Sequence, residues 1–165
     1  MSSVTFRPAK QTDWAGIEHL LLSNKLPLDG AKDHLVGFFV AQDESGLIGC
    51  GGVESRGDTA LLRSVAVIPS RQGEGIGRQI VSLILTQAQT KGVKTIGLLT
   101  TSARQWFFTF GFELADQRHA PSALKRSAEF QGACPVGSDF MMLDLSSWRF
   151  FKSAVSSESS GSLNK

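Results

Sequence analysis

The segment RQGEGIGR, residues 71–78, is the part of the chain whose residue types and spacing best suit chemistry. Glycine lets backbone N–H groups approach a ligand closely, and a following helix N-terminus adds partial positive charge, so such a loop can hold phosphate. A triphosphate-binding loop would place Lys and then Ser or Thr after the last glycine, where this chain has Arg78 and Gln79. A dinucleotide loop would need a later carboxylate, and the next strand, VKTIGLLTTS, ends without one. The neighbouring elements must therefore identify the anion.

Strands and one helix precede this loop. Residues 4–7 are predicted to form a strand that Pro8 stops, and Thr12 can cap a helix whose apolar residues follow the helical period. The strands DHLVGFFVA and LIGCGGVE are joined by a turn at 43–46, and a second turn at 55–58 leads into TALLRSVAV, the most apolar strand. The pattern predicts an antiparallel meander.

Further elements follow the loop. Apolar residues recur with helical spacing from Ile76 to Ala88, until Lys91 and Gly92 end that helix. VKTIGLLTT is predicted as a strand, ARQWFFTF as a helix capped by Thr101 or Ser102, PSALKRSAEFQG as a short helix and SDFMMLDL as the last strand. We therefore predict an α/β (α+β) fold, with a mixed, mostly antiparallel central sheet and helices on both faces.

The composition bounds the class of protein. The chain has 165 residues, of which 41% are hydrophobic, so we expect one domain over residues 1–145, followed by a Ser-rich, disordered tail over residues 146–165. The net charge is +2 and the charges are scattered, which argues against nucleic-acid binding. No apolar run is long enough to span a membrane, so no membrane association is expected.

The cysteines and histidines give no sign of a disulfide framework or a metal site. Cys50 and Cys134 lie far apart, and the N-terminus lacks the apolar core of a signal peptide, so we expect a cytoplasmic protein. The three histidines show no metal-ligand spacing, and no metal is expected.

The stretch LRSVAVIPSRQGEGIGRQIV, together with ARQWFFTFGFE about thirty residues on, resembles the Gcn5-related N-acetyltransferase (GNAT) superfamily over residues 4–145. The resemblance implies acetyl-CoA as cosubstrate. Main-chain hydrogen bonds of β-strand type would hold its pantetheine arm, and an N–H near Val65 would polarise the thioester carbonyl. Phe107 would face the acetyl group, and the loop amides would hold the pyrophosphate. The implied cofactor-binding residues are Val65, Ala66, Val67, Gln72, Gly73, Glu74, Gly75, Ile76, Gly77, Arg78 and Phe107.

The second motif departs from the family pattern. Members often carry a tyrosine that protonates the departing thiolate, whereas this chain has no tyrosine and places Phe107 there. Either the protein binds coenzyme A without catalysis, or the step proceeds without tyrosine. Because a thiol pKa near ~8.5 makes thiolate a tolerable leaving group, we expect catalysis to be retained. Ser64, Thr100 or Thr101 could supply the proton, unless each hydroxyl is bonded to its own sheet.

The acceptor amine needs a base and a binding site. Glu54 is the candidate base, acting through water; the alternative is a solvated carboxylate at a strand end. Arg63, which shares a face with Leu61 and Val65 if no bulge intervenes, needs an anionic partner in its apolar strand. That partner is a substrate carboxylate or an internal carboxylate such as Glu54. Arg71 and Arg104 are further candidates, unless a coenzyme phosphate binds them, and the family's specificity loop implies Asn24, Lys25 and Leu26.

A closer resemblance concerns the substrate. LLLSNKLPLDGAKDHLVGFFVA, GCGGVE, ALLRSVAV and FQGACPVGSDFM resemble the arsenic-resistance N-acetyltransferases, which acetylate the α-amino group of the glutamate-like antibiotic arsinothricin and whose relatives act on phosphinothricin. This implies a small amino-acid substrate and detoxification by acylation. A protein N-terminal acetyltransferase and a noncatalytic acyl-CoA sensor stay open as alternatives, as does a homodimer, which is common in the resembled family.

Overall fold

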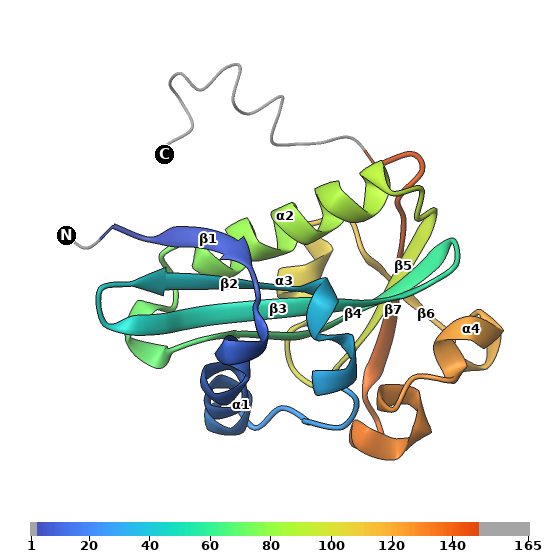
Figure 1. Ribbon diagram of the computed structural model, residues 1–165. Coiled ribbons are helices and arrows are strands. Elements are labelled where there is room, and N and C mark those ends of the chain that lie inside the picture. Colours follow the sequence, from blue (N-terminus) through green and yellow to red (C-terminus); the bar gives the residue numbers. More distant parts are fainter. Residues whose placement is uncertain (1–2, 149–165) are drawn as a thin grey trace.

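The computed structural model describes residues 3–148, and these form one sheet flanked by helices (Figure 1). The strands are β1 (Thr5–Pro8), β2 (Phe38–Asp43), β3 (Gly46–Arg56), β4 (Thr59–Val67), β5 (Thr95–Thr100), β6 (Glu113–Ala115) and β7 (Asp139–Asp144). The helices are α1 (Trp14–Ser23), α2 (Ile76–Thr90), α3 (Arg104–Phe108) and α4 (Ser122–Lys125), with a π-helical turn, η5 (Glu129–Ala133). This part of the chain confirms the predicted fold class.

The sheet has seven strands in the order β1-β2-β3-β4-β5-β7-β6. Neighbouring strands run antiparallel except β4 and β5, which are parallel and pair over Thr59–Leu61 and Thr95–Gly97. Beyond Leu61 the two strands no longer pair, so a gap in the sheet opens toward the end of β4. The strand β6 was not predicted, since its three residues are all exposed and show no apolar alternation.

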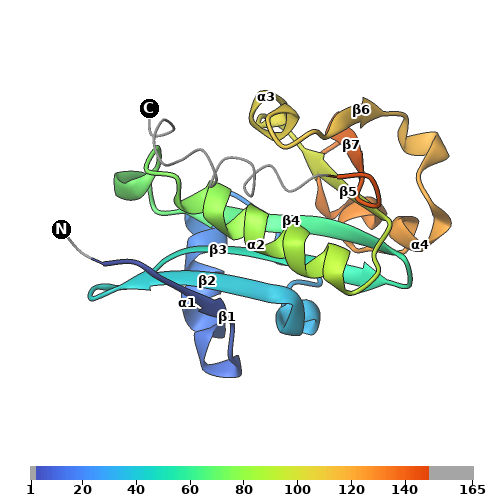
Figure 2. The same cartoon turned by 90° about the horizontal axis from the view of Figure 1, so that it is seen from above.

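Helices cover both faces of the sheet (Figures 1 and 2). The face under α2 and α3 holds the largest apolar cluster, in which Ile80 and Ile84 of α2 pack with Leu62 and Ile96 of the sheet. The opposite face is covered by α1, whose Ile17 and Leu21 pack in a second cluster, and by α4, whose Leu124 packs on Leu61 and Phe140.

A β-bulge interrupts β4 at Ser64. Cys50 of β3 pairs with Ala66 and Gly52 pairs with Arg63, so β4 carries one more residue than β3 between these pairs. Ser64 adopts a φ of 61°, the left-handed conformation that suits a bulge. The extra residue turns Val65 toward the α2 cluster, while Leu61 packs in the cluster under α4. A bulge thus does intervene, and Arg63 and Val65 do not share a face.

Helix starts also differ from the predicted caps. Asp13, not Thr12, precedes α1, and its carboxylate is held by Arg7 at 2.8 Å. The N–H of Ala103, before α3, donates to the Thr100 hydroxyl at 3.0 Å, rather than to Thr101 or Ser102. The expected helix PSALKRSAEFQG divides into α4 and the turn η5, within which Gly132 takes a φ of 113°.

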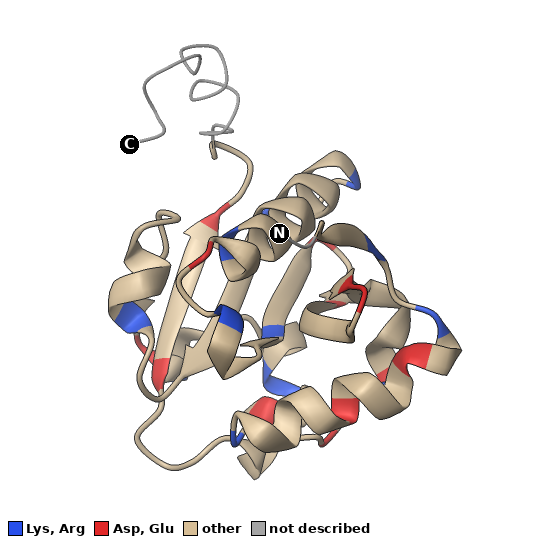
Figure 3. Ribbon diagram, turned by 90° about the vertical axis from the view of Figure 1, so that its left-hand side faces the viewer, with Lys and Arg blue, Asp and Glu red and all other residues tan. Residues whose placement is uncertain are grey.

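The end of the described chain extends the predicted domain slightly. Trp148 packs against the α2 cluster, and its indole N–H donates to the carbonyl of Phe110 at 3.3 Å. Residues 146–148 thus belong to the folded part, while the rest of the predicted Ser-rich tail, residues 149–165, lies outside the described residues. None of the helices described between residues 3 and 148 is long and apolar enough to cross a membrane. Figure 3 shows acidic and basic residues interspersed over the ribbon, as their scatter along the sequence predicts.

Candidate active site

A cavity of about 690 Å³ fills the gap between β4 and β5. One wall is the last half of β4 and the other is the end of β5, which the parallel pairing leaves apart beyond Leu61. The glycine loop, residues 71–78, lies at one end, and the connection between α1 and β2 lies at the other. The cavity therefore joins a predicted anion site to a predicted acceptor site.

The glycine loop is shaped by two left-handed residues. Gly73 and Gly75 have φ values of 87° and 89°, and a Cβ at either would meet open space. Glycine is therefore favoured there by the left-handed backbone conformation and not by contact with neighbouring atoms. Gly75 caps α2, whose first N–H groups are thus exposed at the loop. The amide of Gln72 anchors the loop by donating to the Val67 carbonyl at 3.0 Å.

Most of the predicted cofactor residues do lie together. Glu74 is the exception, because it is absent from the cavity lining and its carboxylate pairs with Arg71 Nε at 2.9 Å. Arg78 is stacked over the Phe110 ring at 4.5 Å, and Phe107 is 7% exposed. The predicted cofactor residues that line the cavity are Val65, Ala66, Val67, Gln72, Gly73, Gly75, Ile76, Gly77, Arg78 and Phe107.

The β4 wall presents main-chain groups to the cavity. Ala66 and Val67 pair with β3 on one side and Val65 lies in the bulge, whereas β5 has diverged on the other side. Peptide groups on that open edge can pair with an extended ligand as a neighbouring strand would. The bulge at Ser64 sets the direction of these groups.

The three hydroxyls predicted as proton donors line the same cavity. Ser64 Oγ accepts a hydrogen bond from Arg63 Nε at 3.0 Å, and Thr100 Oγ1 accepts one from Ala103 N at 3.0 Å. A hydroxyl that accepts still has its own proton to donate, so both remain competent donors. Thr101 is exposed at the rim.

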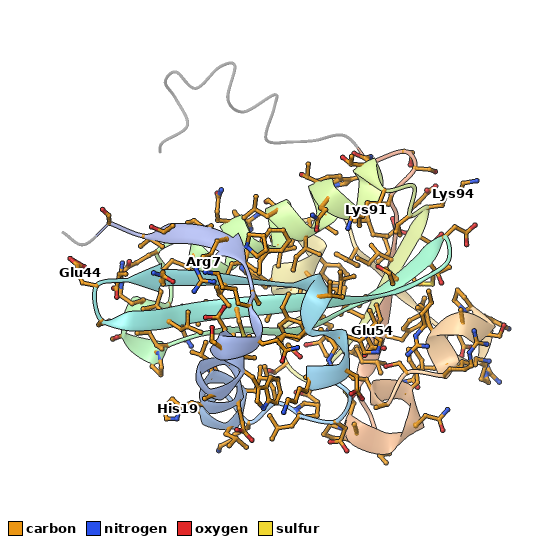
Figure 4. All side chains as sticks on the ribbon, viewed as in Figure 1. Arg7, His19, Glu44, Glu54, Lys91 and Lys94 are labelled. Atoms are coloured by element: carbon orange, nitrogen blue, oxygen red, sulfur yellow. The ribbon has the colours of Figure 1, made fainter. Side chains whose placement is uncertain are left out.

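Glu54 is not part of this cavity. It is fully buried, and its carboxylate accepts from Arg63 at 2.7 Å, from Arg56 at 2.9 Å and from the Ser127 hydroxyl at 3.1 Å (Figure 4). Burial alone would raise its pKa, but the hydrogen bonds from Arg63 and Arg56 outweigh that effect and lower it. The solvated alternative is thus wrong, and the structure does not bring Glu54 to the position of a base.

Arg63 pairs with the internal carboxylate of Glu54, one of the two partners that the sequence allowed. Its side chain is buried, and besides Glu54 it contacts the carboxylate of Glu129 at 3.4 Å from Nε. Arg63 does line the cavity as predicted, but its guanidinium already contacts two carboxylates, the Ser64 hydroxyl and the Pro27 carbonyl. Arg71 lines the cavity but is also paired twice, with Asp43 and Glu74.

The acceptor end contains residues that were predicted and residues that were not. Asn24, Lys25 and Leu26 line it as expected, with Lys25 at a φ of 59° and Asn24 Nδ2 bound to the Leu20 carbonyl at 2.8 Å. Glu129 and Cys134 also line the cavity, and Glu129 lies near this end because Arg63 contacts both its carboxylate and the Pro27 carbonyl. Burial raises the pKa of Glu129 to about 6 and that of Cys134 to about 12. No sequence signal separates Glu129 from the other acidic residues, because only the fold buries it here.

Comparison with known proteins agrees with this geometry. The family model described as an acetyltransferase (GNAT) domain matches residues 34–114. The amino-acid acetyltransferase of Neisseria meningitidis serogroup A is 23% identical over 103 residues, which is 61% of this chain and 24% of that protein. The amino-acid acetyltransferase of Pseudomonas fluorescens is 32% identical over 88 residues, 52% of this chain and 20% of that protein. The chain spans a quarter or less of these relatives.

Solved structures share the fold. N-acetylglutamate synthase from Neisseria gonorrhoeae, complexed with coenzyme A and N-acetyl-glutamate, matches 88% of this chain and 36% of that chain, with a TM-score of 0.74 and 22% identity. A Mycobacterium tuberculosis protein in complex with CoA matches 85% of this chain and 98% of that chain, with a TM-score of 0.69 and 23% identity. The described chain thus has the GNAT fold, and the acetyltransferase (GNAT) model matches it over residues 34–114.

Proposed function

We propose that this domain transfers the acetyl group of acetyl-CoA to the amino group of an amino acid. The cavity is the observation that carries the proposal, because one space runs from the glycine loop, along the open edge of β4, to the acceptor end. The N. gonorrhoeae and M. tuberculosis neighbours are described as complexes with coenzyme A. Their binding of coenzyme A supports, by analogy of fold, the same cosubstrate here.

The residues at the site suit each part of acetyl-CoA. Amides of the glycine loop and the start of α2 bind the pyrophosphate, since they concentrate N–H donors at a helix N-terminus. Main-chain groups of Val65 and Val67 pair with the pantetheine arm. The N–H of Val65, directed by the bulge, polarises the thioester carbonyl as negative charge develops on its oxygen.

The departing thiolate can be protonated without tyrosine. Thr100 and Ser64 line the cavity on its two walls, and each hydroxyl keeps a proton after accepting one hydrogen bond. A thiolate is already a stable leaving group at a pKa near ~8.5, so a weak donor or water suffices. Phe107, in the tyrosine's place, packs beside the transferred group.

The acceptor class we propose is a glutamate-like α-amino acid, with arsinothricin or phosphinothricin as the specific substrate. The curated relatives are named amino-acid acetyltransferases, and the N. gonorrhoeae enzyme is described with N-acetyl-glutamate. Lys25 at the acceptor end supplies a cation for a substrate carboxylate. Acetylation would remove the positive charge of the α-amino group, so that the product no longer resembles glutamate to its target.

Thiol release from acetyl-CoA tests this function, measured with glutamate, phosphinothricin, arsinothricin, other amino acids and short peptides. We expect release with a glutamate analogue, and about a tenfold higher KM with little change in kcat for Lys25→Ala, because a charged hydrogen bond is lost. The matched control is Lys91→Ala, an exposed lysine at the end of α2 (Figure 4). Release with peptides alone would favour the protein N-terminal acetyltransferase, and tight CoA binding without release for any amine would favour the sensor.

A further inference from the structure

Glu129 is a cavity residue that the proposed function has not yet used. It begins the turn η5, is 5% exposed, and lines the acceptor end of the cavity. Its backbone N–H donates to Ser127 Oγ at 3.1 Å, and the same hydroxyl donates to Glu54 Oε2 at 3.1 Å. The turn is therefore tied to the buried ion pair of the sheet, and the Glu129 carboxylate is held at a defined place.

That place is close to the bulge of β4. Glu129 Oε2 lies 3.4 Å from Arg63 Nε, and the same nitrogen lies 3.0 Å from Ser64 Oγ. Ser64 immediately precedes Val65, whose N–H is the proposed oxyanion donor. Because Arg63 Nε contacts both Glu129 and Ser64, the Glu129 carboxylate lies close to the bulge. We expect it to reach an acceptor amine that attacks the thioester carbon beside Val65.

The groups around Glu129 leave it ionised yet able to take up a proton. Arg63 from β4 favours its charged form, while burial and the negative charge of Glu54 from β3 oppose it, and the Cys134 thiol hydrogen-bonds to it. The balance raises its pKa to about 6. Glu54, in contrast, holds the 2.7 Å contact to Arg63 and has a lowered pKa. Of the two carboxylates, Glu129 has the pKa that suits a general base near neutral pH.

We propose that the carboxylate of Glu129 is the general base that takes the proton from the ammonium group of the acceptor; this rests on the proposed function. The freed amine attacks the thioester carbon, an N–C bond forms and the C–S bond breaks. The amine nitrogen loses two protons in all. One goes to Glu129 and then to solvent, and the other ends on the coenzyme A thiolate, which leaves as the thiol.

The test is the pH profile of kcat/KM between pH 5 and 9.5, for the wild type, Glu129→Gln, Glu129→Asp and the control Glu113→Gln, an exposed carboxylate on β6. The wild type is expected to lose activity below about pH 6. For Glu129→Gln we expect about a 100-fold loss at pH 7 that shrinks as the pH approaches the pKa of the amine, because amine deprotonated by solvent needs no base. Glu129→Asp should have a lower kcat/KM but should still lose activity at low pH as the wild type does. The pH profile of Glu113→Gln should match that of the wild type.

Coenzyme A binding, measured by calorimetry on the same four proteins, separates this proposal from the proposed function. Gln removes a charge that burial disfavours, so the variant is expected to fold and to bind coenzyme A normally. The role of Glu129 would be overturned if the wild type turned over and Glu129→Gln had the same rate and the same loss of activity at low pH. Acetyl transfer would then still stand. Coenzyme A binding without turnover by the wild type for any amine would overturn the proposed function, and the role of Glu129 with it.

Discussion

At the scale of single residues, Arg63 is shared by two buried carboxylates, and the sharing is unequal. Glu54 takes its Nη1 at 2.7 Å, while Glu129 contacts its Nε at 3.4 Å. The closer partner is stabilised as a charge, and the farther one keeps a pKa of about 6. The ion pair with Arg63 therefore keeps Glu54 charged as part of the structure. The Glu129 carboxylate, which Arg63 stabilises less, can take up and release a proton near neutral pH.

Glu54→Gln is expected to lower the free energy of unfolding by about 3–5 kcal/mol at pH 7, because it removes the closest carboxylate of the buried Arg63 and half-buried Arg56. Urea denaturation measures the change, with Glu44→Gln, at the exposed turn between β2 and β3, as the matched control (Figure 4). Because the folded state lowers the pKa of Glu54, its stabilisation is complete above the unfolded pKa and disappears as pH falls through the folded value. The two proteins should thus converge in stability only at pH values below the lowered pKa of Glu54; equal stability at pH 7 would contradict the structural role.

At the scale of elements, the bulge in β4 and the loop before α2 both border the cavity that we propose binds acetyl-CoA. The bulge turns Val65 and sets the open edge of β4, and the loop presents the N-terminus of α2. Both depend on left-handed backbone conformations, at Ser64 in the bulge and at Gly73 and Gly75 in the loop. Local backbone geometry, rather than a particular side chain, thus shapes the proposed coenzyme site.

Gly75→Val is expected to abolish coenzyme A binding, because a β-branched residue strains a φ of 89° and covers the N–H groups of the loop. Gly57→Val is the matched control, since Gly57 in the turn between β3 and β4 also has a positive φ, 71°, and open space at its Cβ. Each variant should lose about 1–2 kcal/mol of stability. Isothermal calorimetry should find lost binding in Gly75→Val alone, and normal binding there would show that the loop does not hold the cosubstrate.

At the scale of the whole molecule, the sequence predicted the fold better than the acceptor site. Glycines, apolar periodicity and turn residues are local signals, and they placed β1, β3, β4, β5, β7, α2 and the loop. They missed β6, and they extended β2 back over residues 33–37, which form the 3-10 helix η2 (Lys32–Gly37) instead. The partner of Arg63 could not be chosen, because Glu54 and a substrate carboxylate are equally good partners until the register of β3 and β4 is known. Glu129 was missed since its burial depends on η5 folding against β4, a contact between distant segments of chain.

Acetyl-CoA is expected to stabilise both sides of the gap at once, because β4 and β5 pair only over Thr59–Leu61 within the described sheet and the cosubstrate would lie between their separated ends. At 100 times Kd the free energy of unfolding should rise by about 2.7 kcal/mol. Amide hydrogen exchange should slow at Val65–Val67 of β4 and at residues 98–101 of β5 and its end, and neither change should occur in Gly75→Val. Slower exchange on β4 alone would mean that the ligand binds the glycine loop without spanning the gap, and the proposed path of the pantetheine arm between the strands would then be wrong.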